Sequence, residues 1–386
     1  MVSKHIRYWQ KAIFLGILTL SFVPLPIWAD SGPAHRVDEP FPIQLGTSGG
    51  NIKDISKGFC YGGTLGALVK DASGNQYILS NNHVLARTNA AALGEDIIQP
   101  GLIDQSPACF KDSTDIVANL SNFISINFKT KGTMRTNAVD AAIAQVRVGN
   151  VDPTGFIIDI GTLSSDTVAP SLSMAVKKSG RTTGLTHGNI TAVNATIDVS
   201  YGSGKTARFT NQIVVGPGSF IAAGDSGSLM VENVDTDPRA VGLLFAGGST
   251  TAIANPIGDV LDAFNVSMVG TGIGPDPSAS LLGKILAWAK KFSGVTETQA
   301  ASAQLPAHVS ESAVDAVRRV KERHEGRLLA TPGVIGVGVG LSDTIMKQAA
   351  IEIYVKQATE PLRQALPKSL DGVETKIVET GEIRAY

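Results

Sequence analysis

Three short stretches decide the fold of this chain: SNNHV at 80–84, VDAAI at 139–143 and GDSG at 224–227. Each places one reactive side chain, an imidazole, a carboxylate or a hydroxyl, in an apolar setting typical of β-strands and their turns. A serine hydroxyl is a poor nucleophile at neutral pH. It needs an imidazole to accept its proton and a buried carboxylate to orient that imidazole. The pattern therefore nominates His83, Asp140 and Ser226 as a catalytic set.

The order of these three residues separates folds that share the same chemistry. The α/β-hydrolases run Ser, Asp, His and the subtilisins Asp, His, Ser, whereas chymotrypsin-type enzymes run His, Asp, Ser, as here. A fourth stretch, SGRTTG at 179–184, is similar to a run found in bacterial secreted peptidases. With these four elements the chain resembles the trypsin/chymotrypsin-like serine peptidases, in their bacterial secreted branch, over residues 41–268.

The resemblance implies an all-β fold of two six-stranded antiparallel barrels, the chymotrypsin-like arrangement. By the family's pattern Ser226 is the nucleophile, His83 the general base and then the general acid, and Asp140 the carboxylate that orients the imidazole. The backbone N–H groups of Gly224 and Ser226 form the oxyanion hole of an acyl-enzyme mechanism. The implied activity is that of a serine endopeptidase, a hydrolase acting on protein or peptide substrates with no metal and no other cofactor.

A further expectation concerns Asp225, which would be buried beside the nucleophile. In animal members of the family the equivalent aspartate pairs with a newly cut N-terminus, and no Ile-Val-Gly-Gly-like start is present here. Arg181 is similar to an internal arginine that takes this part in some bacterial relatives. The resemblance therefore implies a structural ion pair between Arg181 and Asp225 that forms the oxyanion loop without proteolytic activation.

The substrate pocket follows from counting along the same pattern. Phe220 is expected near the base of the pocket, with Phe245, Ala246 and Gly247 along its wall. None of these positions is acidic, so nothing there would bind an arginine or lysine. The prediction is a preference for an apolar or small residue at the cleaved position.

Two other functions stay open from the sequence. An esterase of the α/β-hydrolase type is disfavoured, because residue 228 is serine, which breaks Gly-x-Ser-x-Gly, and because the triad order differs. A catalytically silent, peptidase-like binding protein is disfavoured by the presence of all three candidate residues, but a blocked pocket or an occluding C-terminal region would produce one.

Composition narrows the class of protein. The net charge of −1 over 386 residues gives no reason to expect a nucleic-acid partner, and 41 glycines with 6% aromatic residues suit a turn-rich β protein. The two cysteines, Cys60 and Cys109, could form a disulfide in an oxidising compartment or remain buried free thiols. The oligomeric state is not predictable from the sequence.

The N-terminal region has the features of a targeting segment. Residues 1–29 combine a basic start, an apolar stretch and a small residue, Ala29, before a polar chain, which predicts a cleaved signal peptide. An uncleaved anchor is the alternative. Either way we expect export to a periplasm or the cell exterior, with membrane contact only through this segment, and a loose N-terminal arm over 30–40.

The sequence predicts a linker and a further domain after the barrels. Residues 269–304 form a predicted linker, within which 281–292 has helical apolar spacing with lysines on the other face. Residues 305–386 predict a small separate α+β domain in the order helix, strand, strand, helix, strand. Its helix would be capped by Ser310 or Ser312. The glycines of the first of these strands, at 336, 338 and 340, suggest close backbone packing rather than a dinucleotide loop, because no helix follows them.

Overall fold

The computed structural model describes residues 34–386 except 273–308 and 346–347. The predicted signal peptide (1–29) and the predicted amphipathic helix (281–292) therefore lie outside the described residues. Across the described ranges, no helix combines the length and the apolar character needed to cross a membrane.

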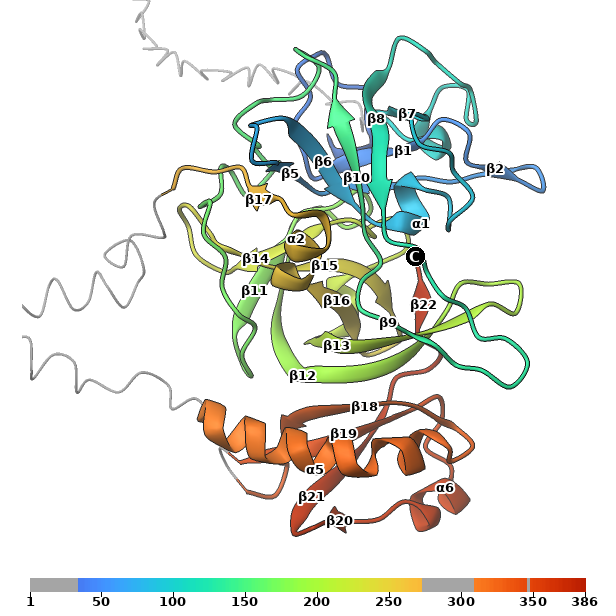
Figure 1. The fold of residues 1–386 in the computed structure, drawn as a ribbon, viewed down its shortest axis with the longest axis vertical. Helices are drawn as coiled ribbons and strands as arrows, with labels where there is room; N and C mark the ends of the chain where they lie inside the picture. The colour runs from blue at the N-terminus through green and yellow to red at the C-terminus, as the bar shows by residue number, and fades with distance from the viewer. Residues whose placement is uncertain (1–33, 273–308, 346–347) are drawn as a thin grey trace, which may run out of the picture. The chain divides into compact units, whose positions relative to one another are not determined.

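The first barrel is formed by strands from the N-terminal half of the chain (Figure 1). They are β1 (Thr47–Asn51), β4 (Gly63–Leu65), β5 (Ala67–Lys70), β6 (Gln76–Ser80), β7 (Asp96–Ile98), β8 (Ile116–Phe123) and β10 (Ala142–Val146). Their order is β5-β6-β10-β8-β7-β1-β4, and β4 and β5 are the two halves of one strand bent at Gly66, so the sheet closes on itself. A Cβ at Gly66 would lie 1.9 Å from the carbonyl oxygen of Gly227. Glycine is therefore required where this strand passes the GDSG turn.

The second barrel repeats this topology. Its strands are β11 (Ala175–Lys178), β12 (Thr186–Ser200), β13 (Thr206–Gly216), β14 (Leu229–Glu232), β15 (Ala240–Gly247) and β16 (Ala252–Pro256). The neighbours run β12-β11-β14-β15-β16-β13, and β13 pairs back to β12, so this sheet is also closed. All of these pairings are antiparallel. The prediction of two six-stranded antiparallel barrels, the chymotrypsin-like arrangement, is confirmed.

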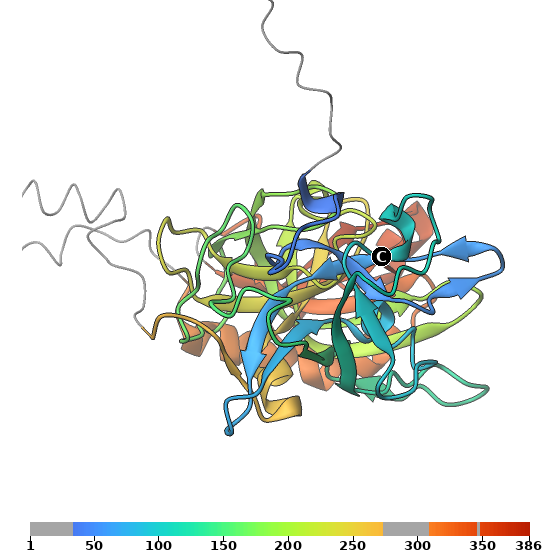
Figure 2. The same cartoon turned by 90° about the horizontal axis from the view of Figure 1, so that it is seen from above.

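Shorter elements lie between and beside these strands. They are η1 (Ala34–Arg36), β2 (Ile55–Ser56), β3 (Phe59–Cys60), α1 (Asn82–Leu85), η2 (Leu102–Asp104), β9 (Thr136–Asn137), η3 (Gly218–Phe220), α2 (Ile257–Phe264) and β17 (Ser267–Met268). The β2–β3 hairpin projects from the first barrel, and Figure 2 shows this projection from above.

The C-terminal region has the predicted order of elements. It contains α5 (Glu311–Leu329), β18 (Val334–Leu341), β19 (Ala349–Val355), α6 (Glu360–Ala365), β20 (Ser369–Leu370), β21 (Val373–Glu379) and β22 (Arg384–Ala385). Of the two predicted caps, Ser310 caps α5, since its Oγ accepts a hydrogen bond from the N–H of Ala313 at 3.3 Å. Val317, Val320 and Leu328 form the buried face of this helix.

The predicted small C-terminal α+β domain is confirmed, but it is not separate from the barrels as expected. Strand β18 pairs antiparallel with β12 of the second barrel, so one sheet runs through both. The apolar cluster of the second barrel also continues into the C-terminal region, joining residues such as Ile213 and Leu244 to Val317 and Ile351. Residues 32–386 accordingly form one compact unit. Strand β12 is 15 residues long, and β18 pairs with its residues 192–197.

The glycines of β18 allow this close approach. A Cβ at Gly336 would lie 2.8 Å from the carbonyl oxygen of Thr196 on β12, and one at Gly340 would lie 2.3 Å from the carboxylate of Glu352. The prediction of close backbone packing at these glycines is confirmed.

The N-terminal arm is docked where the structure describes it, so the prediction of a loose arm is wrong from Ala34 onward. His35 is buried; its Nδ1 lies 2.9 Å from the carbonyl oxygen of Gly46 and its Nε2 lies 3.0 Å from Asp159 Oδ2. Arg36 donates to the carbonyl oxygens of Arg181 and Thr182. The polar composition predicted an exposed segment, but polar groups hold it through hydrogen bonds.

Candidate active site

His83 lies in α1, the single helical turn that follows β6 at the edge of the first barrel. The side chain of Asn81 donates to the carbonyl oxygen of Asp140 at 2.7 Å, and that of Asn82 donates to the carbonyl oxygen of Ile124 at 2.7 Å. Both asparagines are buried, so these bonds fix the turn against the neighbouring strands. The two asparagines of SNNHV thus position the imidazole that follows them.

The imidazole of His83 is paired with the carboxylate of Asp140. The Nδ1–Oδ2 distance is 2.6 Å, and the backbone N–H of His83 donates to Asp140 Oδ1 at 3.3 Å. Asp140 is fully buried, and its own N–H donates to Asn255 Oδ1 at 2.9 Å. Burial lowers the pKa of His83, but the charge and hydrogen bond of Asp140 outweigh it and leave that pKa raised. The structure therefore brings together two members of the predicted set.

Tyr201 is a third member of this cluster that the sequence analysis did not identify. Its hydroxyl donates to Asp140 Oδ2 at 2.7 Å, and its ring lies edge-on to the ring of His83 at 5.9 Å between centroids. Burial and the Asp140 carboxylate raise the pKa of Tyr201 well above its usual range, so the hydroxyl stays protonated and remains a donor. Tyr201 follows the end of β12, and no local motif marks it.

Ser226 lies in the turn between η3 and β14, and it is fully buried. Its Oγ donates to the carbonyl oxygen of Phe245 at 3.1 Å, and its own carbonyl oxygen accepts from the N–H of Thr64 on the first barrel at 2.8 Å. The turn contacts both barrels, as the resemblance implied. The serine hydroxyl is directed at Phe245, while His83 Nε2 lies 2.9 Å from the main-chain oxygen of Tyr386.

The turn leaves two backbone donors unused. Gly224 has a φ of 98°, and a Cβ there would lie 2.5 Å from the guanidinium of Arg181, so only glycine fits. Among the hydrogen bonds of the described residues, none uses the N–H of Gly224 or of Ser226. Backbone donors away from water are normally paired. Two unpaired donors flanking a serine are the arrangement that an oxyanion hole requires.

Asp225 holds this turn, but its partner is not the predicted one. Its carboxylate lies 3.3 Å from Nζ of Lys178, and both side chains are fully buried. Burial lowers the pKa of Lys178. The carboxylate also accepts from the N–H groups of Thr182, Thr183 and Ala222, and from the hydroxyl of Thr183. Five groups thus fix Asp225.

The predicted Arg181–Asp225 ion pair is wrong. The guanidinium of Arg181 binds Asp104 of the first barrel, with Nη2 2.7 Å from Oδ1 and a second bond from Nε to Oδ2. Lys178 lies on β11 and faces the barrel interior, whereas Arg181 lies in the following turn and faces the other barrel. The cationic residue beside Asp225 is therefore three positions earlier than the motif suggested.

The four residues predicted for the substrate pocket separate into two groups. Ala246 and Gly247 lie at the end of β15 and pair with Ala385 and Arg384 of β22. The rings of Phe220 and Phe245 are instead buried in apolar clusters, with Phe245 stacked 4.8 Å from Phe209. Phe245 adjoins the site through its carbonyl oxygen alone.

A cleft of about 500 Å³ opens beside His83. Its lining includes Tyr61 and Gly62 after the β2–β3 hairpin, Arg87, and Tyr386. Asp54 also lies here, and burial raises its pKa to about 6 against the opposing effects of Arg87 and His83.

Cys60 and Cys109 are joined by a disulfide, which settles the alternative that the sequence left open. The bond ties the β2–β3 hairpin to the loop after η2, and the hairpin side of this link adjoins the cleft. The structure describes no group of three or more His, Cys, Asp or Glu side chains arranged to hold a metal ion within its resolved ranges.

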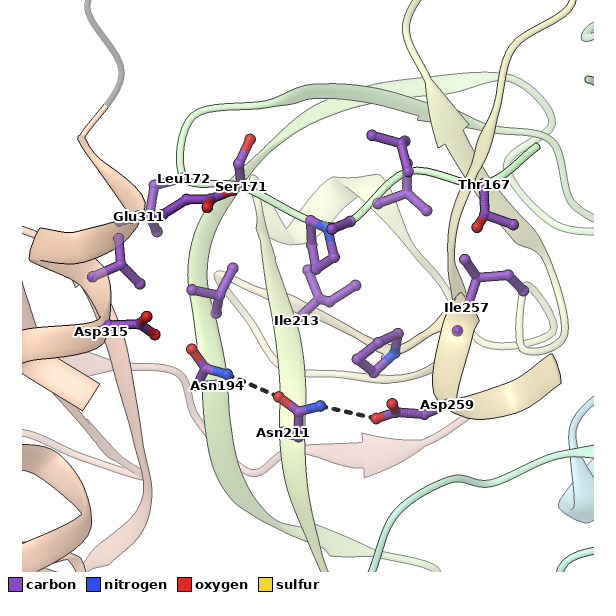
Figure 3. Close-up of a pocket in the computed structure, with 18 of the residues that line it drawn as sticks. Thr167, Ser171, Leu172, Asn194, Asn211, Ile213, Ile257, Asp259, Glu311 and Asp315 are labelled. Atoms are coloured by element: carbon purple, nitrogen blue, oxygen red, sulfur yellow. Dashed lines mark hydrogen bonds between the residues drawn. The ribbon is translucent and has the colours of Figure 1, made fainter. Parts of the chain in front are cut away.

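A second cavity, also about 500 Å³, lies among β12, β13, α2 and α5 (Figure 3). Asn194 donates to Asn211, which donates to Asp259, both at 2.9 Å. None of the predicted site residues lines it.

The Nal1 C-terminal domain family matches residues 119–255, about a third of the chain, which is too small a share to assign the chain to that family. No curated protein matches the sequence.

Solved structures with similar folds are serine proteases. A glutamic-acid-specific serine protease is 20% identical and covers 58% of this chain and 100% of its own, with a TM-score of 0.39. Thermobifida fusca Protease A is 17% identical, covers 59% and 99%, and has a TM-score of 0.37. Cellulomonas bogoriensis chymotrypsin is 17% identical, covers 59% and 98%, and has a TM-score of 0.37. TM-scores this low carry no argument about activity, so function has to be argued from the site itself.

Proposed function

We propose that this protein is an exported serine endopeptidase that uses His83, Asp140 and Ser226 through an acyl-enzyme intermediate. The observation that carries the proposal is the pair of His83 with the buried Asp140, together with a serine turn that has two unused N–H donors. Ionisable pairs with shifted pKa values and buried backbone donors without a partner are features that concentrate at functional sites.

The chemistry follows from these groups. Ser226 Oγ bonds to the carbonyl carbon of the scissile peptide as its proton passes to His83 Nε2, and the carbonyl oxygen takes the negative charge. The N–H groups of Gly224 and Ser226 stabilise that oxygen, and each such donor is worth about 3–4 kcal/mol in the transition state. The imidazolium, held by Asp140, gives its proton to the leaving amine. A water molecule that gives its proton to His83 then attacks the carbonyl carbon of the acyl-enzyme. The bond between this carbon and Ser226 Oγ breaks, and His83 returns the proton to the serine.

Export and specificity belong to the same proposal. Export rests on the signal-like composition of residues 1–29. The preference for an apolar or small residue at the cleaved position is supported by Gly247, which adjoins Ile221 and the apolar cluster that contains it.

The test is labelling of the protein lacking residues 1–29 with a fluorophosphonate probe, beside Ser226→Ala and His83→Ala. We expect slow labelling that both substitutions abolish. Labelling that persists in Ser226→Ala, or a folded protein that never labels, would overturn the proposal. Turnover of esters with no cleavage of peptides would identify an esterase instead.

A further inference from the structure

The end of the described chain lies in the catalytic site. Strand β22 pairs antiparallel with β15, with Ala385 opposite Ala246 and Arg384 opposite Gly247. In this fold an extended peptide substrate would add to the same strand edge next to the serine. In Figure 1, β22 and the mark for the chain end lie beside α1, which carries His83.

The main chain of Tyr386 contacts the proposed base. His83 Nε2 lies 2.9 Å from the main-chain oxygen of Tyr386, and Nδ1 of the same ring is engaged by Asp140. Because this main-chain oxygen and the Asp140 carboxylate only accept, the ring makes both hydrogen bonds as an imidazolium, with a proton on each nitrogen. An imidazolium cannot take the proton of Ser226, whose hydroxyl is directed at Phe245.

The side chain of Tyr386 fills the adjoining apolar site. A Cβ at Gly247 would lie 2.8 Å from Tyr386 Cε2 and equally close to Ile221, so the ring occupies space that only glycine leaves open. The ring packs against the apolar cluster that contains Phe220 and Ile221. An aromatic side chain therefore fits where the residue at the cleaved position of a substrate would bind.

The segment before Tyr386 is fixed to the body of the protein. Ile383 is buried, and its carbonyl oxygen accepts from the N–H of Ser200 at 2.9 Å. Thr380 is also buried, and its carbonyl oxygen accepts from the N–H of Ser249 at 2.8 Å. These contacts lie outside the groove and hold the chain so that Arg384–Tyr386 extends into it.

We propose that residues 384–386 are a cis-acting inhibitor that binds as substrate does, and that they report the substrate class: an extended peptide with an aromatic residue at the cleaved position after a small one. This rests on the proposed function of the site. A tethered ligand has an effective concentration of ~1 mM, so a segment with a Kd of ~0.1 mM would keep the groove about 90% occupied.

The activity test compares the chain lacking residues 384–386 with the full chain, using the fluorophosphonate probe and peptides with tyrosine or alanine before the cleaved bond. We expect the deletion to label roughly tenfold faster. The tyrosine peptide should be cleaved in preference. Lys368→Ala, an exposed substitution in the same region, is the control and should label like the full chain. Equal labelling of the deletion and the full chain would overturn the inference and leave the proposed function standing.

A binding test separates the two proposals. The fluorescent peptide RAY, the sequence of 384–386, is added to a chain that lacks these residues and carries Ser226→Ala. We expect saturable binding by fluorescence anisotropy, weakened by changing the tyrosine of the peptide to alanine. Absence of binding would overturn the inference whether or not the protein labels. If the peptide binds but no variant is labelled, the inference that residues 384–386 occupy a peptide-binding groove stands, and the proposed catalytic function is refuted.

Discussion

The pair of Lys178 and Asp225 determines whether the serine turn keeps its shape, and a substitution at Lys178 tests this. At 3.3 Å and an effective dielectric constant of about 20, the attraction is about 5 kcal/mol before the cost of burial. Breaking one side of a buried pair typically costs 3–5 kcal/mol. Asp225 keeps four hydrogen bonds in Lys178→Met, so we expect the lower end, about 3 kcal/mol of unfolding free energy.

The assay is a double-mutant cycle by urea unfolding. Asp225→Asn removes the charge and keeps an acceptor, so Lys178→Met with Asp225→Asn should cost clearly less than the sum of the single changes. Arg181→Met with Asp225→Asn should be additive within about 0.5 kcal/mol, because Arg181 binds Asp104. Stronger coupling of Asp225 to Arg181 than to Lys178 would refute the assignment. The probe should also label Lys178→Met slowly, about 100-fold or more below the parent, if the turn loses one oxyanion donor.

Three further predictions follow from single contacts. Tyr201→Phe removes a hydrogen-bond donor from the buried Asp140 carboxylate and should lower the unfolding free energy by about 1.5–3 kcal/mol. The control is Tyr61→Phe, at an exposed tyrosine, and equal stability of the two variants would contradict this prediction. The pKa of Asp54 is about 6 in the folded protein and 3.8 ordinarily, so the unfolded state loses this proton first as pH rises. The unfolding free energy of the parent therefore falls between pH 4 and pH 6. Asp54→Asn should therefore gain up to about 3 kcal/mol relative to the parent above pH 6 and nothing below pH 4, measured by thermal unfolding against pH. Reduction of the Cys60–Cys109 bond, which spans 49 residues, should lower the unfolding free energy by about 4 kcal/mol, and an unchanged urea midpoint in reductant would contradict it.

The barrels and the His83–Asp140 pair were predictable because their signals are local. Each lies in a stretch of a few residues whose composition indicates its surroundings. His83 follows two asparagines after a strand, and Asp140 lies among alanines and other apolar residues. The closed sheets follow from many short strands with glycine turns, and Gly66 shows why one such glycine is needed.

The contacts that escaped prediction join distant parts of the sequence. Tyr201 reaches Asp140 across 61 positions, and Tyr386 reaches His83 across 303. No periodicity encodes such contacts, because they depend on how the ends of strands converge. The error at Arg181 has a different cause: two cationic residues lie three positions apart and both are buried, so the local sequence does not show which of them lies beside Asp225.

The shared sheet of β12 and β18 has a consequence for any attempt to divide this protein. A fragment ending at Gly270 would lose β18 and expose an unpaired row of backbone groups along residues 192–197 of β12. It would also uncover apolar side chains such as Val193 and Ile213 that the C-terminal helix and strands cover. An open, apolar strand edge of this kind is a template for aggregation. The two barrels and the C-terminal region should therefore melt in one cooperative transition, and neither should be recoverable as a soluble half.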